Sequence, residues 1–204
     1  VEDGGLVTLT LSAVNAGEIT ADGIDFKAGY SFSNDLGQFA ANVTYTHVNQ
    51  YTFGGVPGMV NGLLDTGEYD AAGTTGDGNL VRSQPDNKGT ITMNWRNGNH
   101  GLTVINRHIG SYRDLGYEAA TLVANDFTRP LLSREIGSYN TWDMQYNYNK
   151  AWDNSRFGST TFTIGLLDAL NKTLPYRELS SLNYDAAVFE GRGKRWYARA
   201  LWSF

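Results

Sequence analysis

Apolar and polar side chains alternate with a period of two along several stretches of the chain. In GIDFKAGYSF, the even-numbered positions are apolar or aromatic, whereas the odd-numbered positions include Asp25, Lys27 and Ser31. Successive side chains of a β-strand point to opposite faces, so the pattern predicts a strand with one apolar and one polar face. The same alternation predicts strands over residues 38–48, 89–95, 102–112, 139–150, 159–170 and 195–204.

The connections between these strands alternate between short and long. Segments 33–37 and 96–100 contain the Asn, Asp and Gly residues that tight turns prefer. Segment 150–158 is moderately short, and the long connections are 49–87, 111–137 and 172–193. The best helix candidate is 117–127, a segment that can form a short helix inside a loop. Long structureless loops are uncommon in soluble domains. Outer-membrane barrels, in contrast, alternate short periplasmic turns with long extracellular loops.

The residue types on the two faces also favour a membrane barrel. The apolar face is rich in Phe, Tyr, Trp and Ala, and the polar face is rich in Asn, Asp, Gln, Thr and Ser. Tyr and Trp favour the membrane–water boundary, because the ring sits in apolar surroundings while its polar atom stays wet. The pattern therefore predicts an all-β, antiparallel transmembrane β-barrel. A soluble β-sandwich that binds carbohydrate explains the alternation too and remains an alternative.

Composition changes this picture only slightly. The formal net charge of −5 argues against a nucleic-acid-binding protein, which usually carries a basic patch. No run of apolar residues is long enough for a transmembrane helix, and the mean hydropathy is −0.38. The first residues, VEDGGLVTLT, lack the order of a signal peptide. The chain is therefore expected to be a mature protein or a piece of something longer.

The segment that ends at Phe32 decides how many strands are expected. It can form one long strand with an irregular middle, or two strands joined by a hairpin at 15–17. One strand of about 27 residues would rise roughly 65–70 Å, well beyond an apolar band about 25 Å tall. That solution gives seven strands and an incomplete barrel. The hairpin gives eight strands, an even number that can close alone.

Four segments, in this order along the chain, resemble segments of TonB-dependent outer-membrane receptors. They are VNAGEITADGIDFKAGYSF, RHIGSYRD, GLLDALNKTLP and FEGRGKRWYARALWSF. The chain departs from the family pattern at Asp168 and Asn171, where Asn and Asp are usual. It also departs at Pro175, which comes one residue late, and at Glu190, which replaces a proline.

The resemblance implies a 22-stranded barrel around a plug domain, with residues 1–204 as the C-terminal portion of the barrel, about its last seven strands (possibly eight). Plug and TonB box would then be absent from this chain. The implied function is active import of a scarce solute, such as a siderophore, cobalamin, saccharide or peptide, across a bacterial outer membrane. The implied partners are outer-membrane lipid, the plug and remaining strands, the TonB complex and the barrel-assembly machinery. A complete small barrel of eight strands, with a passive or structural role, is the alternative.

The last predicted strand has an apolar face that ends on an aromatic residue. Trp196, Trp202 and Phe204 share that face. They resemble the C-terminal sorting signal that the outer-membrane assembly machinery recognises. Physically, a final strand that pairs at an edge and faces lipid needs apolar outward side chains.

Patterns of catalytic and metal-binding residues give no support for an enzyme or a cofactor. No two of His47, His100 and His108 have the spacing of metal ligands. EGRGKR lacks the spacing of a phosphate-binding loop, and no serine has a nucleophile-elbow pattern. An acidic loop offers oxygen ligands for calcium, although its spacing does not match a calcium loop, and a solvated loop is the simpler interpretation. Its acidic residues are Asp65, Glu68, Asp70 and Asp77.

Candidate contacts with a solute are aromatic and arginine residues of the predicted extracellular loops, because rings stack on flat ligands and guanidinium groups pair with carboxylates. These residues are Tyr51, Phe53, Tyr69, Arg82, Arg113, Tyr117, Arg134, Tyr176 and Arg177. Charged residues on the polar face of the strands are candidates for contact with the plug. These are Asp25, Lys27, Asp143, Arg195 and Arg199.

Overall fold

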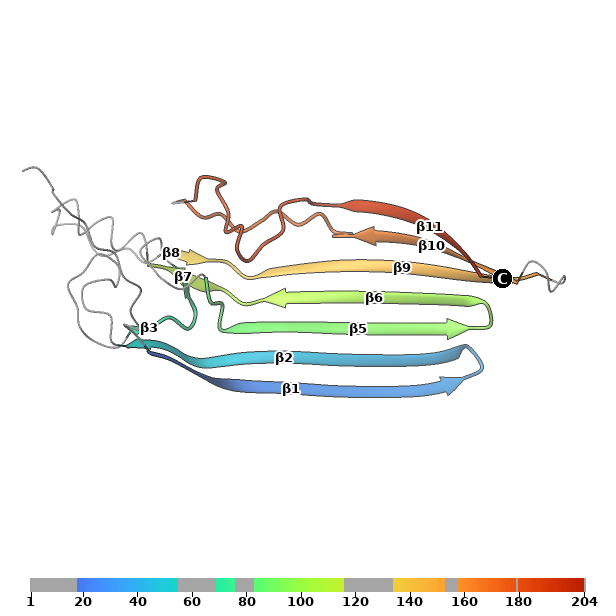
Figure 1. Cartoon of the computed structure of the whole chain (residues 1–204), viewed down its shortest axis with the longest axis horizontal. Coiled ribbons are helices and arrows are strands. Elements are labelled where there is room, and N and C mark those ends of the chain that lie inside the picture. Colours follow the sequence, from blue (N-terminus) through green and yellow to red (C-terminus); the bar gives the residue numbers. More distant parts are fainter. Residues whose placement is uncertain are drawn as a thin grey trace, which may run out of the picture.

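The computed structural model describes residues 18–54, 69–75, 83–115, 134–152, 158–178 and 180–203. Long antiparallel strands form one sheet in the order β1-β2-β5-β6-β9-β10-β11, so each strand pairs with its neighbours along the chain (Figure 1). The strands are β1 (Glu18–Asn34), β2 (Gly37–Gly54), β5 (Asn87–Asn97), β6 (His100–Ile109), β9 (Tyr139–Ala151), β10 (Ser159–Leu167) and β11 (Arg195–Ser203). The all-β, antiparallel architecture predicted from the alternation is confirmed.

Shorter strands gather at one end of this sheet. β3 (Tyr69–Asp70) pairs with the end of β2, whereas β4 (Thr74–Thr75), β7 (Tyr112–Asp114) and β8 (Arg134–Ile136) form a separate sheet. Within that small sheet β4 and β7 run parallel. Its strands come from two connections, β2–β5 for β4 and β6–β9 for β7 and β8, so it joins loops that are distant in the sequence.

Several predicted strand boundaries were wrong. The strand predicted over 102–112 ends at Ile109, and Tyr112 belongs to the small sheet instead. The strand predicted over 159–170 ends at Leu167, because Asp168 adopts a φ of 47°, which is outside the extended region. β2 continues past residue 48 to Gly54. The short helix considered for 117–127 lies outside the described residues.

The irregular middle of the first strand is a β-bulge. β1 pairs with β2 from Glu18 to Asn34, and the register shifts between Asp22 and Gly23. A Cβ atom at position 23 would lie 2.4 Å from the carbonyl oxygen of His47, so the bulge needs glycine there. The described part of β1 is one continuous strand, while the alternative hairpin at 15–17 lies outside the described residues.

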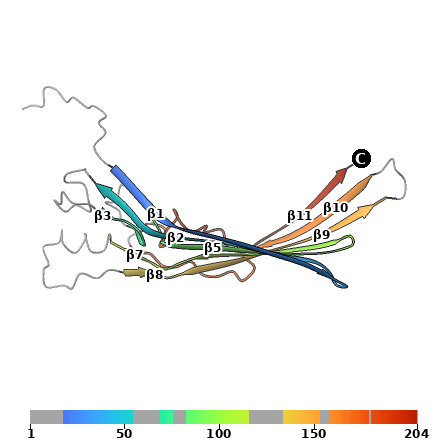
Figure 2. The same cartoon turned by 90° about the horizontal axis from the view of Figure 1, so that it is seen from below.

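The register gives the main sheet one polar face and one apolar face. Lys27, Thr44, Thr90, Arg107 and Thr141 form one row across the polar face. On the apolar face the side chains are largely uncovered, with Trp196 at 79% and Tyr30 at 71% exposure. The main strands lie in a single layer, which is not the double layer of the β-sandwich alternative (Figure 2).

The two ends of the sheet differ as the connection lengths predict. The tight turns β1–β2 and β5–β6 lie at the same end as the C-terminus (Figure 1). In the second turn Gly98 has a φ of 53°, a left-handed conformation that favours glycine. The small sheet and β3 lie at the opposite end, called the loop end below (Figure 2).

A small hydrophobic core lies at the loop end. Tyr112, Ile136, Tyr139 and Phe189 are buried against one another. Tyr139 belongs to the polar face of β9, so the connection between β10 and β11, which carries Phe189, folds over that face. Outside this core most large apolar side chains of the described strands are exposed.

Candidate functional site

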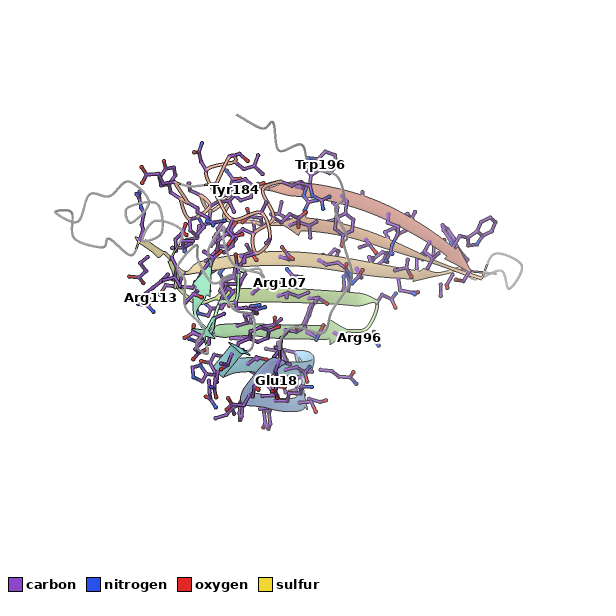
Figure 3. All side chains as sticks on the ribbon, turned by 60° about the vertical axis from the view of Figure 1, so that its left-hand side comes forward. Glu18, Arg96, Arg107, Arg113, Tyr184 and Trp196 are labelled. Atoms are coloured by element: carbon purple, nitrogen blue, oxygen red, sulfur yellow. The ribbon has the colours of Figure 1, made fainter. Side chains whose placement is uncertain are left out.

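Charged and polar side chains of the wall meet the last connection at the loop end, where side chains are dense (Figure 3). They enclose a cavity of about 440 Å³. Strands β6, β9, β10 and β11 supply one side of it, and residues 188–193 of the connection supply the other. The lining residues are Arg107, Ile109, Tyr139, Thr141, Asp143, Leu167, Asp168, Val188, Phe189, Glu190, Gly193 and Arg195.

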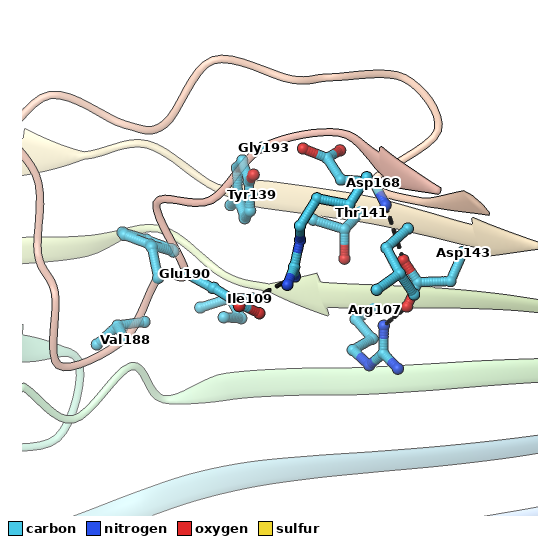
Figure 4. Close-up of a pocket in the computed structure, with 12 residues that line it drawn as sticks. Arg107, Ile109, Tyr139, Thr141, Asp143, Asp168, Val188, Glu190 and Gly193 are labelled. Carbon is cyan, nitrogen blue, oxygen red and sulfur yellow. Dashed lines mark hydrogen bonds and ion pairs between the residues drawn. The ribbon is translucent and has the colours of Figure 1, made fainter. Parts of the chain in front are cut away.

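Asp143 organises one side of the cavity (Figure 4). It forms a salt bridge with Arg107 of the neighbouring strand, and its Oδ1 accepts a hydrogen bond of 2.9 Å from the backbone N–H of Asp168. The Asp143 side chain is 13% exposed, whereas the Arg107 side chain is 49% exposed. The pair therefore holds the end of β10 against β9 while the guanidinium stays accessible to a solute.

Glu190 organises the other side of the cavity. Its Oε1 accepts a hydrogen bond of 3.0 Å from Arg195 Nη2 and also forms a salt bridge with Arg192. These contacts tie the connection to the start of β11 (Figure 4). The cavity thus presents guanidinium, carboxylate and hydroxyl groups beside apolar rings, a set that can hydrogen-bond and stack on a polar solute.

A buried carboxylate joins the loops next to the cavity. Asp185 is 2% exposed and accepts hydrogen bonds from the Tyr112 hydroxyl, at 2.8 Å, and from the Ser83 hydroxyl. Burial and the hydrogen bond to Asp185 raise the pKa of the Tyr112 phenol far above its usual value of 10.0. Tyr112 therefore stays a neutral donor at physiological pH.

Ion pairs hold the same loops together. Arg177 Nε lies 2.9 Å from Asp114 Oδ2, and both side chains are largely buried. Arg134 forms a salt bridge with Glu178, and its guanidinium lies 4.9 Å from the ring centroid of Tyr176. The cavity is thus built on a cross-linked cluster of loops, and we refer to these residues, with Tyr112, Ser83 and Asp185, as the loop cluster.

The structure places the predicted solute contacts in several different parts of the fold. Tyr51 lies in β2, and Phe53 pairs with Tyr69 of β3. Arg113 is exposed in β7, whereas Arg134, Tyr176 and Arg177 belong to the loop cluster. Arg82 and Tyr117 lie outside the described residues. The described candidates do not line the cavity, and a solute contact by any of them stays a prediction.

The predicted plug contacts share the polar face. The register places Asp25, Lys27, Asp143, Arg195 and Arg199 there. Asp25 accepts a hydrogen bond of 2.6 Å from the Thr46 hydroxyl, and Asp143 and Arg195 line the cavity. Contact of these side chains with a plug stays a prediction.

Sequence reasoning missed Arg107, Asp168, Glu190 and Asp185 as site residues. Arg107 could have been found, because it occupies a polar-face position on a predicted strand. Asp168 and Glu190 were noted only as departures from a family motif. Asp185 had no sequence signal, since its partner Tyr112 is 73 residues away.

The remaining predictions concern the last strand and metal binding. Trp196 and Trp202 lie exposed on the apolar face of β11, while Phe204 lies outside the described residues. Of the acidic loop, Asp70 is described, and its Oδ1 accepts hydrogen bonds from the backbone N–H groups of Tyr51 and Ala72. Asp65, Glu68 and Asp77 lie outside the described residues. Within the described segments, His, Asp and Glu residues form no group that could hold a metal ion.

Residues 2–168 match the family described as TonB dependent receptor-like, beta-barrel. The match covers most of the chain, and the chain therefore belongs to this family. No curated protein and no solved structure matches significantly. Within the described segments, no helix is long and apolar enough to cross a membrane.

Family membership identifies the chain as part of an outer-membrane transport receptor and not as an enzyme. Members of the family lie in the Gram-negative outer membrane, where the barrel works with a plug domain, the TonB complex and a small-molecule ligand. In outer-membrane barrels the apolar face of the wall meets lipid and the long loops are extracellular.

Proposed function

We propose that this chain forms the C-terminal wall of a 22-stranded barrel that imports a scarce solute by TonB-dependent active transport. The cavity at the loop end is where the solute meets the wall on its way to the plug. Siderophore, cobalamin, saccharide and peptide are the solute classes considered. No bond of the solute is made or broken, because the energy is spent on rearranging the plug.

The observation that carries this proposal is the position of the cavity. It opens on the polar face, at the loop end, which we assign to the extracellular side, and its lining combines Arg107 and Arg195 with carboxylates and aromatic rings. A solute that leaves water there exchanges its hydration for charged groups that the Arg107–Asp143 and Arg195–Glu190 pairs already hold in place. Such preorganisation lowers the cost of binding.

A substitution within the cavity tests this proposal in the intact receptor. Thr141 lies on the cavity wall, so Thr141→Trp fills the space without removing any of its charges. We expect uptake of the native solute to fall at least tenfold and to vanish in cells that lack TonB. The measurement is accumulation of labelled solute in whole cells.

Thr141→Val is the matched control, because it keeps the volume of the side chain and should keep uptake near the native rate. Equal uptake by the Trp and Val variants would remove the cavity from the transport path. Equal uptake with and without TonB would contradict active import altogether.

We also propose that the apolar side chains of β11, together with Phe204, serve as the recognition signal for barrel assembly. Trp196 is 79% exposed and Trp202 is 56% exposed on the apolar face, which supports this role. An edge strand with outward aromatic side chains can pair and meet lipid at the same time.

A further inference from the structure

The cavity at the loop end carries most of its charges in pairs (Figure 4). Arg107 is paired with Asp143, and Arg195 is paired with Glu190, with 3.0 Å between Arg195 Nη2 and Glu190 Oε1. Asp168 is the remaining charged residue of the lining, so three carboxylates face two guanidinium groups. The lining therefore offers no net positive charge to an anion.

Hydrogen-bonding groups nevertheless remain unused around the cavity. Among the described residues, Arg195 Nε is buried without a partner, and Arg107 uses only its Nη1. Asp168 and Glu190 accept hydrogen bonds through one oxygen each, Oδ1 and Oε1, and the Thr141 hydroxyl makes no bond within the described segments. Free donors and free acceptors thus lie close to one another, because each arginine is held beside a carboxylate.

Apolar side chains form the rest of the lining. They are Ile109, Tyr139, Leu167, Val188 and Phe189. The rings of Tyr139 and Phe189 pack edge to face, with their centroids 5.3 Å apart, so core contacts fix their positions. A group that fills the cavity therefore needs both an apolar surface and several hydrogen-bonding groups.

The volume of the cavity limits the size of that group. Its 440 Å³ equals the space of about 15 water molecules, at about 30 Å³ each. One or two sugar rings fit into such a space. A whole cobalamin or a whole ferric siderophore is larger, so these solutes would enter only in part.

We propose that the cavity binds a neutral glycosyl unit, which makes the imported solute a saccharide. A hydroxyl group both donates and accepts, so neighbouring sugar hydroxyls can bind a guanidinium N–H and a carboxylate oxygen of the same pair. The C–H face of the sugar ring then meets the apolar part of the lining. The inference rests on the proposed import function and selects one of its four solute classes.

Charge distinguishes a saccharide from the other solute classes. A carboxylate or catecholate of a siderophore would approach three carboxylates while both guanidinium groups are already paired, and such like-charge contacts are unfavourable. The ammonium group of a peptide would find its one unpaired counter-charge in Asp168, which is only 9% exposed. The ammonium group would lose its hydration to reach that carboxylate.

The test measures binding of the intact receptor, purified in detergent, to an array of neutral oligosaccharides and of oligosaccharides that end in a uronic acid. The receptor should bind at least one neutral oligosaccharide, and it should bind the uronic-acid counterpart at least tenfold more weakly. Thr141→Trp should weaken binding of the neutral oligosaccharide at least tenfold, because the indole ring fills the cavity. Folding of each variant is checked by heat-modifiable electrophoretic mobility.

Thr44→Trp is the matched control. Thr44 lies in the same register row of the polar face as Thr141, with β5 and β6 between their strands, and it does not line the cavity. The substitution adds the same ring at the same height of the wall, so binding should stay at the native level.

The double variant Asp168→Asn/Glu190→Gln tests the charge argument. Both substitutions keep the shape of the side chain and an oxygen acceptor but remove the negative charge, and asparagine tolerates the φ of 47° at position 168. The preference for the neutral oligosaccharide over its uronic-acid counterpart should fall at least tenfold.

The inference fails if the receptor binds no neutral oligosaccharide or prefers the uronic acid. It also fails if Thr141→Trp binds like the native receptor, if Thr44→Trp weakens binding equally, or if the double variant keeps the native preference. The binding assay contains no TonB, so it is independent of active import. TonB-dependent uptake of a solute that is not a saccharide would overturn this inference and leave the proposed function intact.

Discussion

Asp185 and Asp114 are buried carboxylates that hold the loop cluster in place. Each has lost its hydration, and each recovers part of that cost from fixed partners, Tyr112 for Asp185 and Arg177 for Asp114. Breaking such a contact costs more than the contact contributes, because the remaining partner stays buried and unsatisfied. Single substitutions here should therefore loosen the loops beside the cavity.

Tyr112→Phe tests this at the residue that links β7 to Asp185. We expect the loop cluster to lose about 1–3 kcal/mol at neutral pH, because a buried acceptor loses its donor. In the native protein the raised pKa of Tyr112 means that its contribution is fully present below pH 10.0 and is lost as the pH rises further. Proteolysis of the loops at neutral and alkaline pH measures both effects.

Tyr176→Phe provides the control for that comparison. Tyr176 is 50% exposed, and its ring contacts Arg134 without needing the hydroxyl. This variant should be cleaved like the native protein at neutral pH. If Tyr112→Phe is cleaved no faster than Tyr176→Phe, the hydrogen bond to Asp185 does not support the loops.

At the scale of elements, the faces of the strands could be predicted and the loops could not. Lys27, Asp143 and Arg199 lie on the predicted face because the period of two follows from backbone geometry alone. The end of β10 was missed because Asp168 adopts a positive φ. The alternation of apolar and polar residues does not reveal this change of backbone conformation. The Asp185 contacts with Ser83 and Tyr112 span 102 and 73 residues, and no local pattern encodes them.

Gly165 on β10 shows how two strands fit at close range. A Cβ atom at this position would lie 2.2 Å from the ring of Tyr197 on β11, and the Tyr197 hydroxyl donates to Gln145 Oε1 at 2.7 Å. Gly165→Ala should therefore displace the ring and cost about 1–3 kcal/mol of unfolding free energy. Unfolding in urea, followed by tryptophan fluorescence, measures this cost.

The double variant Gly165→Ala/Tyr197→Ala identifies the cause. Without the ring, the added methyl group meets no obstacle, so Gly165→Ala should be nearly neutral in the Tyr197→Ala background. A cost that persists in this background would mean that alanine disturbs the backbone of β10 and that the ring is not responsible.

At the scale of the whole molecule, the described strands form an open wall. β1 and β11 lie at opposite edges of the sheet, and among the described strands β1 pairs only with β2 and β11 only with β10 (Figure 1). Unpaired edges at membrane depth are not stable in hydrocarbon, because their backbone groups lack hydrogen-bond partners. Both edges must therefore find further strands before the wall can face lipid.

The mass of the native protein decides where those strands come from. If both edges pair with other parts of one long polypeptide, the receptor isolated from outer membranes should have an intact mass several times the 22.4 kDa of this chain. A closed barrel of eight strands would instead have a mass near 22.4 kDa, with residues 1–17 supplying the strand between the edges. Denaturing mass spectrometry of the purified protein separates the two outcomes. The smaller mass would contradict both the large barrel and an enclosed plug domain. A barrel of eight strands has room inside only for its own side chains.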